Sequence, residues 1–161
     1  MSELACREAS LSDMKGIWDL LRGVAADVPV SIDSDADQER ALSRLMECCS
    51  SNCSTVVLNE EKEIVGALLA ERDLLDLALS NKETINVRLA AVASSHRDDS
   101  VFKMLFDPLI SRAAPIYISL STGEGQGLSK VLDASGFSML PGGAKAEVFK
   151  WEPPVKAKET A

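Results

Sequence analysis

Apolar positions recur along this chain with helical spacing in two early segments. After Ser10 they fall three or four residues apart, at Met14, Ile17, Trp18, Leu21, Val24 and Ala25. That spacing predicts an amphipathic helix, with Ser10 and Asp13 as a variant capping box at its start. A second helix is expected over residues 35–49, with its apolar face at Leu42, Leu45, Met46 and Cys49.

Short β-branched or alternating segments predict the strands. They cover residues 4–9, 53–58, 63–70, 84–94, 115–120, 137–140 and 144–151. A polar turn at 59–62 joins the second and third of these segments. Gly66 interrupts the third and indicates a bulge or a close backbone approach. Residues 74–82 fit either a helical turn or a continuation of the strand.

Residues 84–113 predict a buried strand that runs through a short polar turn into a helix. The helix is expected over 98–113, because its apolar residues recur on one side at Val101, Met104, Leu105 and Leu109. Pro108 predicts either a kink or a new helical segment capped by Asp107. The first turn of such a helix leaves N–H groups unpaired, so this junction is a candidate anion site.

A glycine-rich loop at 121–127 and a short helix at 128–134 are expected before the last hairpin, whose turn is at 141–143. The loop lacks the Lys and Ser/Thr of a P-loop and the GxGxxG spacing of a dinucleotide site. We therefore interpret it as a connection rather than a phosphate cradle.

Length and composition favour one soluble globular domain at 1–151, followed by a mobile polar tail at 152–161. The chain has 161 residues, of which 46% are hydrophobic and 26% charged. No apolar run approaches the roughly 20 residues of a membrane span, and the N-terminus lacks a signal-peptide pattern, so we expect a cytoplasmic protein with no membrane partner. The net charge of −8 argues against nucleic acid and favours a cationic or amine-bearing substrate.

The cysteines and the single histidine do not predict a metal site. Cys48, Cys49 and Cys53 lie close together, but their spacing differs from that of zinc-binding pairs. We expect reduced cysteines that pack as small hydrophobic residues. His96 is interpreted as a solvated turn residue rather than a phosphate ligand, and Tyr117 as a residue of the core or sheet face.

The order and spacing of these elements resemble the GNAT superfamily of acetyl-CoA-dependent N-acetyltransferases. The resemblance rests on Cys6-Arg7-Glu8-Ala9 before Asp13, on Ile64-Val65-Gly66, and on Ala134-Ser135-Gly136-Phe137. It implies an α/β (α+β) single domain with a mixed, mostly antiparallel sheet of six to seven strands, about four helices, and splayed fourth and fifth strands. Acetyl-CoA would lie in the gap between those strands. The implied cofactor-binding residues are Ala91, Val92, Ala93, Arg97, Ser100 and Val101, and the amides of 90–93 would polarise the thioester carbonyl.

The sequence departs from the family pattern on both sides of the implied site. Arg97 matches the start of the pyrophosphate turn, but Ser100 replaces its first glycine and Phe102 its second small residue. Asp98 and Asp99 would stabilise a helix start and repel a pyrophosphate. The family's catalytic Tyr and Asn correspond here to Leu132 and Gly125. The remaining candidates for a general base are the carboxylates Glu71, Asp73 and Glu83.

Three hypotheses follow from these patterns. The first is an acyltransferase acting on a small or peptidyl amine. The second is a catalytically inactive GNAT-fold binding or interaction module that has lost acetyl-CoA binding. The third is an unrelated α/β domain, in which the fourth and fifth strands would not splay. A homodimer through the apolar edge at 144–151 is expected on the same resemblance.

Overall fold

The computed structural model describes residues 3–24, 34–81, 83–96, 99–112, 114–121, 132, 134, 136–140 and 146–152. The strands are β1 (Ala5–Glu8), β2 (Thr55–Leu58), β3 (Ile64–Arg72), β4 (Ile85–Val92), β5 (Ile116–Ser121), β6 (Ser138–Leu140) and β7 (Ala146–Trp151). The helices are α1 (Met14–Gly23), α2 (Asp35–Ser50), α3 (Leu74–Ser80) and α4 (Asp99–Ile110), with 3₁₀ turns η1 (Leu11–Asp13) and η2 (Ser94–His96). Most of the expected loop at 121–127, helix at 128–134, turn at 141–143 and tail lies outside the described residues.

The strands form one mixed sheet in the order β1-β2-β3-β4-β5-β7-β6. Every neighbouring pair is antiparallel except β4 and β5, which run parallel. This confirms the predicted sheet of mostly antiparallel strands. The prediction that residues 144–151 form an edge of the sheet was wrong, because β7 lies between β5 and β6. The outer strands are β1 and β6. The edge on which the expected dimer was based is therefore not at β7.

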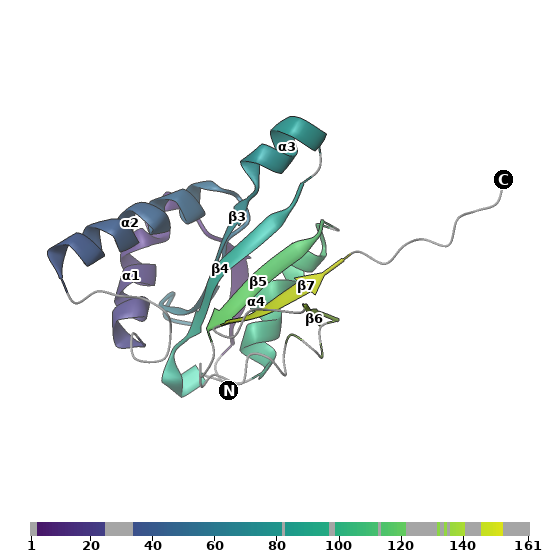
Figure 1. Cartoon of the computed structure of the whole chain (residues 1–161). Helices are drawn as coiled ribbons and strands as arrows, with labels where there is room; N and C mark the ends of the chain where they lie inside the picture. Colours follow the sequence, from purple (N-terminus) through teal and green to yellow (C-terminus); the bar gives the residue numbers. More distant parts are fainter. Residues whose placement is uncertain are drawn as a thin grey trace.

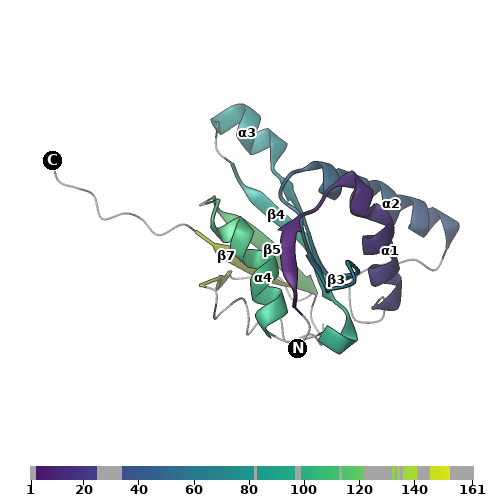
Figure 2. The ribbon, with the colours of Figure 1, turned by 180° about the vertical axis from the view of Figure 1, so that it is seen from behind.

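Helices cover both faces of the sheet (Figures 1 and 2). On one face, α4 packs on strands β2 to β5 around the fully buried Phe102, Leu105 and Phe106. On the other face, α1 and α2 bury Ile17 and Leu45 against β2, β3 and β4. The sheet is therefore buried on both sides, which explains why its central strands read as almost continuous apolar runs.

Capping side chains lie at the starts of η1 and α2, and the sequence predicted the first of these caps. Ser10 and Asp13 form the capping box of η1, which leads directly into α1. The Ser34 hydroxyl accepts a hydrogen bond from the Asp37 N–H at 3.1 Å at the start of α2.

The buried face of α2 is narrower than predicted. Leu45, Cys48 and Cys49 are buried, but Leu42 and Met46 are 37% and 49% exposed. Each residue turns the helix by about 100°, so Met46 lies on the flank of the stripe that Leu45 begins. The α2 face packs on the sheet through Leu45, Cys48 and Cys49 near its C-terminal end rather than through a broad apolar surface.

Gly66 combines the two roles that the sequence left open. The β2–β3 register shifts beside it, between Val57 and Leu58, which is a bulge. A Cβ atom at Gly66 would also lie 3.3 Å from Val101 Cγ1 on α4. The glycine therefore lets α4 approach the sheet closely.

Pro108 neither ends α4 nor starts a new segment, because one helix spans Asp99–Ile110 around it. Proline has no N–H, so the carbonyl of Met104 loses its partner within the helix. That carbonyl instead accepts from the Cys6 thiol at 3.2 Å, and the next carbonyl, of Leu105, accepts from the Thr55 hydroxyl at 2.8 Å. The Cys6 side chain of β1 thus supplies the donor that Pro108 lacks, and Thr55 of β2 adds a second bond to the same helix.

The ambiguous segment after β3 forms the helix α3. It stands at the end of the β3–β4 pair (Figure 1) and leaves Leu75 and Leu79 66% and 77% exposed. The helical spacing of leucines in residues 74–82 therefore indicates a short, exposed helix and not an element of the core.

Candidate functional site

The parallel strands β4 and β5 separate part of the way along their length. They pair only between Ile85–Val87 and Ile116–Ile118, although β4 continues to Val92 and β5 to Ser121. Beyond Val87 the two strands share no ladder, which is the predicted splay. The third hypothesis, an unrelated domain without this separation, is therefore wrong.

A bulge in β4 lies where the two strands separate. Leu69 pairs with Leu89 and Ala70 pairs with Val87, so Arg88 is an extra residue in β4. Ile85 and Val87 face α4, whereas Leu89 and Ala91 face α1 and α2. The bulge therefore changes the alternation of side chains between the two faces in mid-strand.

The main chain of β4 beyond the bulge borders the gap toward β5. The N–H of Ala93 donates to the Val65 carbonyl at 2.8 Å, so Ala93 directs its main-chain groups toward β3. Main-chain groups alternate along an antiparallel strand, and those of Ala90 therefore point toward β5. An acyl chain lying in the gap would meet main-chain donors and acceptors at this edge.

The predicted cofactor-binding residues divide into three groups. Ala91 and Val92 are fully buried at the end of β4, and Ala93, the next residue, is half-buried. Ser100 is exposed in the first turn of α4, whereas the side chain of Val101 is fully buried beneath that helix. Arg97 and Asp98 lie outside the described residues.

Phe102, which replaces a small residue of the family's turn, points away from the helix start. Its side chain is 1% exposed and packs in the core beneath α4. The steric objection to an anion at this turn is therefore removed, because the aromatic ring does not occupy the surface of the first helical turn.

The three candidate bases lie at one end of the sheet, in different surroundings. Glu83 pairs with Arg112, whose Nε lies 3.1 Å from Glu83 Oε1. Asp73 directly precedes α3, and its carbonyl accepts from the Leu77 N–H at 3.1 Å. Glu71 is more enclosed than Glu83, with 16% of its side chain exposed against 30%. The sequence alone did not distinguish the surroundings of these three carboxylates.

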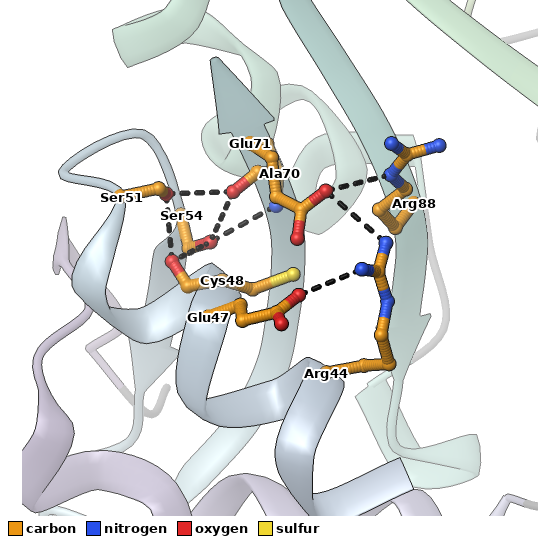
Figure 3. A network of polar contacts seen from close by, with 8 residues as sticks. All are labelled: Arg44, Glu47, Cys48, Ser51, Ser54, Ala70, Glu71 and Arg88. Atoms are coloured by element: carbon orange, nitrogen blue, oxygen red, sulfur yellow. Dashed lines mark hydrogen bonds and ion pairs between the residues drawn. The ribbon is translucent and has the colours of Figure 1, made fainter. Parts of the chain in front are cut away.

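Glu71 binds two guanidinium groups through a single oxygen (Figure 3). Its Oε2 accepts from Arg88 Nε at 3.0 Å and from Arg44 Nη2 at 3.2 Å. Arg44 also reaches Glu47 on its own helix, at 2.6 Å. The carboxylate therefore holds two arginines from α2 and β4 next to each other, and its geometry is that of a positioning group.

Two serines hold α2 against β3 and so set the distance between Arg44 and Glu71. The Ser51 hydroxyl lies 2.7 Å from the carbonyl oxygens of both Cys48 and Ala70. The buried Ser54 hydroxyl accepts from the Ala70 N–H at 2.9 Å and lies 2.9 Å from the Cys48 carbonyl (Figure 3). These bonds fix the end of α2 with buried polar contacts.

Two hollows lie on either side of this ion-pair network. The first, of about 350 Å³, is lined by Leu21, Asp37, Arg40, Ala41, Arg44, Leu45, Cys48, Leu69, Arg88 and Leu89; we call it the arginine pocket. The second, of about 640 Å³, is lined by Arg44, Glu47, Ser50, Ser51, Glu71, Arg72, Asp73, Asn86 and Arg88. Arg44 and Arg88 line both.

Sequence reasoning missed Arg44 and Arg88 as site residues. Arg88 lies in a strand that reads as continuously apolar around it, and Arg44 lies on the polar side of a helix. Their convergence depends on the bulge in β4, which leaves no signal in residue types. A charged residue inside the most apolar strand was the available indication.

The other candidate side chains take no part in the gap. Burial raises the pKa of the Cys48 thiol to about 12, with a further contribution from the Glu71 charge, and raises the pKa of the Cys49 thiol to about 11. Among the described residues no group of three or more His, Cys, Asp or Glu side chains gathers to hold a metal ion. The Ser95 hydroxyl lies 2.9 Å from His96 Nδ1, and Lys150 Nζ lies 5.2 Å from the centre of the Tyr117 ring.

Leu132, at the family's tyrosine position, is fully buried in the core cluster under α4. Its hydrocarbon side chain has no proton to transfer. Gly125, at the asparagine position, lies outside the described residues.

Comparison with solved structures places the architecture in a known class. An acetyltransferase from Corynebacterium glutamicum related to histone acetyltransferase HPA2 superposes over 98% of this chain and 99% of its own, with a TM-score of 0.67 and 20% identity. Naa50 from Arabidopsis thaliana, in complex with the bisubstrate analogue CoA-Ac-MVNAL, covers 92% of this chain and 98% of its own at a TM-score of 0.70 and 11% identity. A Drosophila melanogaster polyamine N-acetyltransferase covers 93% of this chain and 100% of its own, with a TM-score of 0.65 and 12% identity.

This chain therefore has the GNAT fold of the acetyltransferases. No protein-family model and no curated protein matches it by sequence. None of the helices in the described ranges is long and apolar enough to cross a membrane.

Proposed function

We propose that this chain binds an acyl-CoA between β4 and β5 and transfers its acyl group to an amine nitrogen. The observation that carries the proposal is the early end of the β4–β5 ladder at Val87 and Ile118, beyond which β4 offers main-chain groups to the gap. The Naa50 structure, which has the same fold, holds a CoA-based bisubstrate analogue. The Drosophila enzyme with this fold acetylates amines.

The transfer needs few side chains of this protein. An N–H at the Ala90 edge would polarise the thioester carbonyl, and the amine nitrogen would attack the carbonyl carbon directly. A C–N bond forms, the C–S bond breaks, and CoA leaves as the thiolate. The amine gives up one proton and the thiolate takes one. In this proposal Glu71 positions arginines, and the amine proton passes to Asp73 or to water in the hollow that both carboxylates line.

A second candidate function is a non-catalytic module that binds a partner or a CoA without transferring the acyl group. The observation in its favour is Leu132, which is buried where the family has its acid. Such a chain would keep the fold and the gap but would lack a proton donor for the leaving thiolate. The two candidates differ in turnover rather than in shape.

The experiment is isothermal titration of acetyl-CoA and of free CoA into the protein, followed by a CoA-release assay with primary amines. We expect binding at micromolar strength, weakened by Arg97→Glu and by Ser100→Glu, because added negative charge at the start of α4 repels the pyrophosphate. Ser111→Glu, which makes the same change just beyond the other end of α4, is the matched control.

The outcomes of this experiment distinguish the acyltransferase from the non-catalytic module. Binding with CoA release supports the acyltransferase, whereas binding without release from any amine supports the non-catalytic module. No heat at millimolar acetyl-CoA, with the protein folded by circular dichroism, would overturn the acyl-CoA proposal.

A further inference from the structure

The lining of the arginine pocket holds more guanidinium groups than carboxylates, although the chain as a whole is acidic. The net charge is −8, yet three guanidinium groups, those of Arg40, Arg44 and Arg88, meet in this pocket with one carboxylate, that of Asp37. Asp37 pairs with Arg40. Glu71 and Glu47, which bind the other two arginines, line the neighbouring hollow instead. Each guanidinium therefore has a carboxylate partner, and an anionic ligand here would meet the guanidinium N–H groups that these pairs leave open.

The orientation of Arg88 is suited to binding a carboxylate. Glu71 takes its Nε, and within the described residues the structure gives the guanidinium no other partner. The two Nη groups extend beyond Glu71 (Figure 3), and half of the side chain is exposed. A guanidinium fixed through Nε presents its remaining N–H groups as a planar fork, which matches the two oxygens of a carboxylate.

The rest of the pocket is apolar. Its remaining lining side chains are Leu21, Ala41, Leu45, Cys48, Leu69 and Leu89. A ligand with a hydrocarbon body and one anionic group would place the body on the leucines and the anion on the arginines. A polycation would meet three like charges.

The pocket also adjoins the gap where acyl transfer would occur. Arg88 is the bulge residue at which β4 leaves β5, and Leu89, the next residue, lines the pocket as well. A ligand bound to Arg88 would therefore lie beside the β4 segment that borders the gap. This location is that of an acceptor, on the α2 side of the strand.

We infer that the acceptor amine of this protein carries a carboxylate, which the guanidinium groups of Arg88 and its neighbours Arg40 and Arg44 recognise. The inference rests on the proposed acyl transfer. It reverses the expectation from net charge, because overall charge does not determine the charge of a site. The substrate class is a small amino acid-like amine with an apolar body.

The test compares amines that differ only in a carboxylate. The pairs are phenylalanine against 2-phenylethylamine and 6-aminohexanoate against hexylamine, each with acetyl-CoA, with CoA release as the readout. We expect the carboxylate to raise kcat/KM by about tenfold or more in at least one pair, as a hydrogen-bonded charge pair allows. Preference for the partner without a carboxylate in both pairs would overturn the inference.

Substitutions assign the preference to the pocket. Arg88→Gln should remove most of the preference through KM, and Arg40→Gln, at an exposed position, should reduce it less. Arg22→Gln removes one positive charge from an exposed site on α1 that does not line the pocket, and it should leave the preference unchanged. An unchanged preference in Arg88→Gln would count against the inference.

Binding measurements keep the inference separate from the acyl transfer on which it rests. Titration of CoA first reports whether the gap binds the nucleotide. Titration of phenylalanine and 6-aminohexanoate into the CoA-loaded protein then reports on the pocket even when no CoA is released. Binding that is lost in Arg88→Gln supports a carboxylate site, and no binding of either compound at 10 mM, roughly the weakest range of specific small-ligand affinity, would refute it.

Discussion

The thiol of Cys6 donates a hydrogen bond to the carbonyl oxygen of Met104 at 3.2 Å, across 98 positions of sequence. The bond exists because Pro108, four residues after Met104, cannot supply the N–H that a helix normally provides. Cys6, in the outer strand β1, therefore supplies the hydrogen-bond donor that the carbonyl of Met104 lacks within α4.

Cys6→Ala should destabilise the protein by about 1 kcal/mol, because a partly buried carbonyl loses its donor. Cys6→Ser, which keeps a donor, should cost less. The test is urea unfolding of Cys6→Ala in the wild-type chain and in Pro108→Ala, where the restored N–H should make the cysteine dispensable. Equal costs of Cys6→Ala in both backgrounds would contradict this account.

The Arg7–Asp13 pair should make stability depend on pH in the acid range. Two bonds of 2.7 and 2.8 Å join the guanidinium to a carboxylate that is 7% exposed, and this pairing holds the pKa of Asp13 below its usual value. A lowered pKa in the folded state stabilises the protein above the unfolded pKa of about 4. That stabilisation disappears as pH falls through the folded value.

Asp13→Asn should therefore cost about 1–2 kcal/mol at pH 7 and progressively less below pH 4, because the wild type also loses its charge there. Urea midpoints between pH 7 and pH 2.5 measure the difference. Asp19→Asn, which breaks the exposed Lys15–Asp19 pair, should stay within about 0.5 kcal/mol at all pH values. A constant cost of Asp13→Asn across this range would exclude the charge effect.

Gly66→Ala should destabilise by about 1 kcal/mol, since the new methyl group meets the buried Val101 at 3.3 Å and overpacking outweighs the entropy gain. In a Val101→Ala background the same change should become neutral or stabilising. Thermal unfolding of the four proteins measures the coupling. Gly23→Ala is the control, because a Cβ there has no atom within 4 Å and should stabilise α1 slightly.

Cys48 and Cys49 should resist thiol reagents in the native protein. Both are buried, and their raised pKa values leave almost no thiolate at pH 8. Reaction with a disulfide reagent should modify them only with the rate of unfolding, whereas all four cysteines react at once in denaturant. Mass spectrometry of partially labelled protein identifies the sites, and rapid native labelling of Cys48 would contradict the buried placement.

The sequence predicted the elements better than it predicted their contacts. Periodicity located α1, the sheet strands and α4, because each buries an apolar face that leaves a regular pattern. It misjudged Met46, which lies at the margin of the α2 stripe, and the edge expected at β7. The final hairpin was predicted, but not that β7 is the strand through which it joins β5. The side on which a hairpin joins a sheet is set by tertiary packing, which a local pattern does not encode.

The candidate site was predicted only in outline. The strand–helix junction followed from the apolar pattern and the gap from the resemblance, and Phe102 posed a difficulty that its burial resolves. Glu71 was singled out as a base, but its arginine partners from α2 and β4 could not be foreseen. Pairing of charged side chains depends on register, and a one-residue bulge in β4 changes that register without altering the composition of the strand.

The bulge at Arg88 also shifts by one residue the alternation of β4 side chains between the two faces of the sheet. Odd-numbered residues point to α4 before it, and even-numbered residues point there after it. Deleting Arg88 would restore a regular alternation in which Leu89 and Ala90 keep their present faces, whereas deleting any later residue of β4 would exchange the two faces for everything that follows it. In evolution, the loss of one residue from this strand should therefore be tolerated at the bulge and not beyond it.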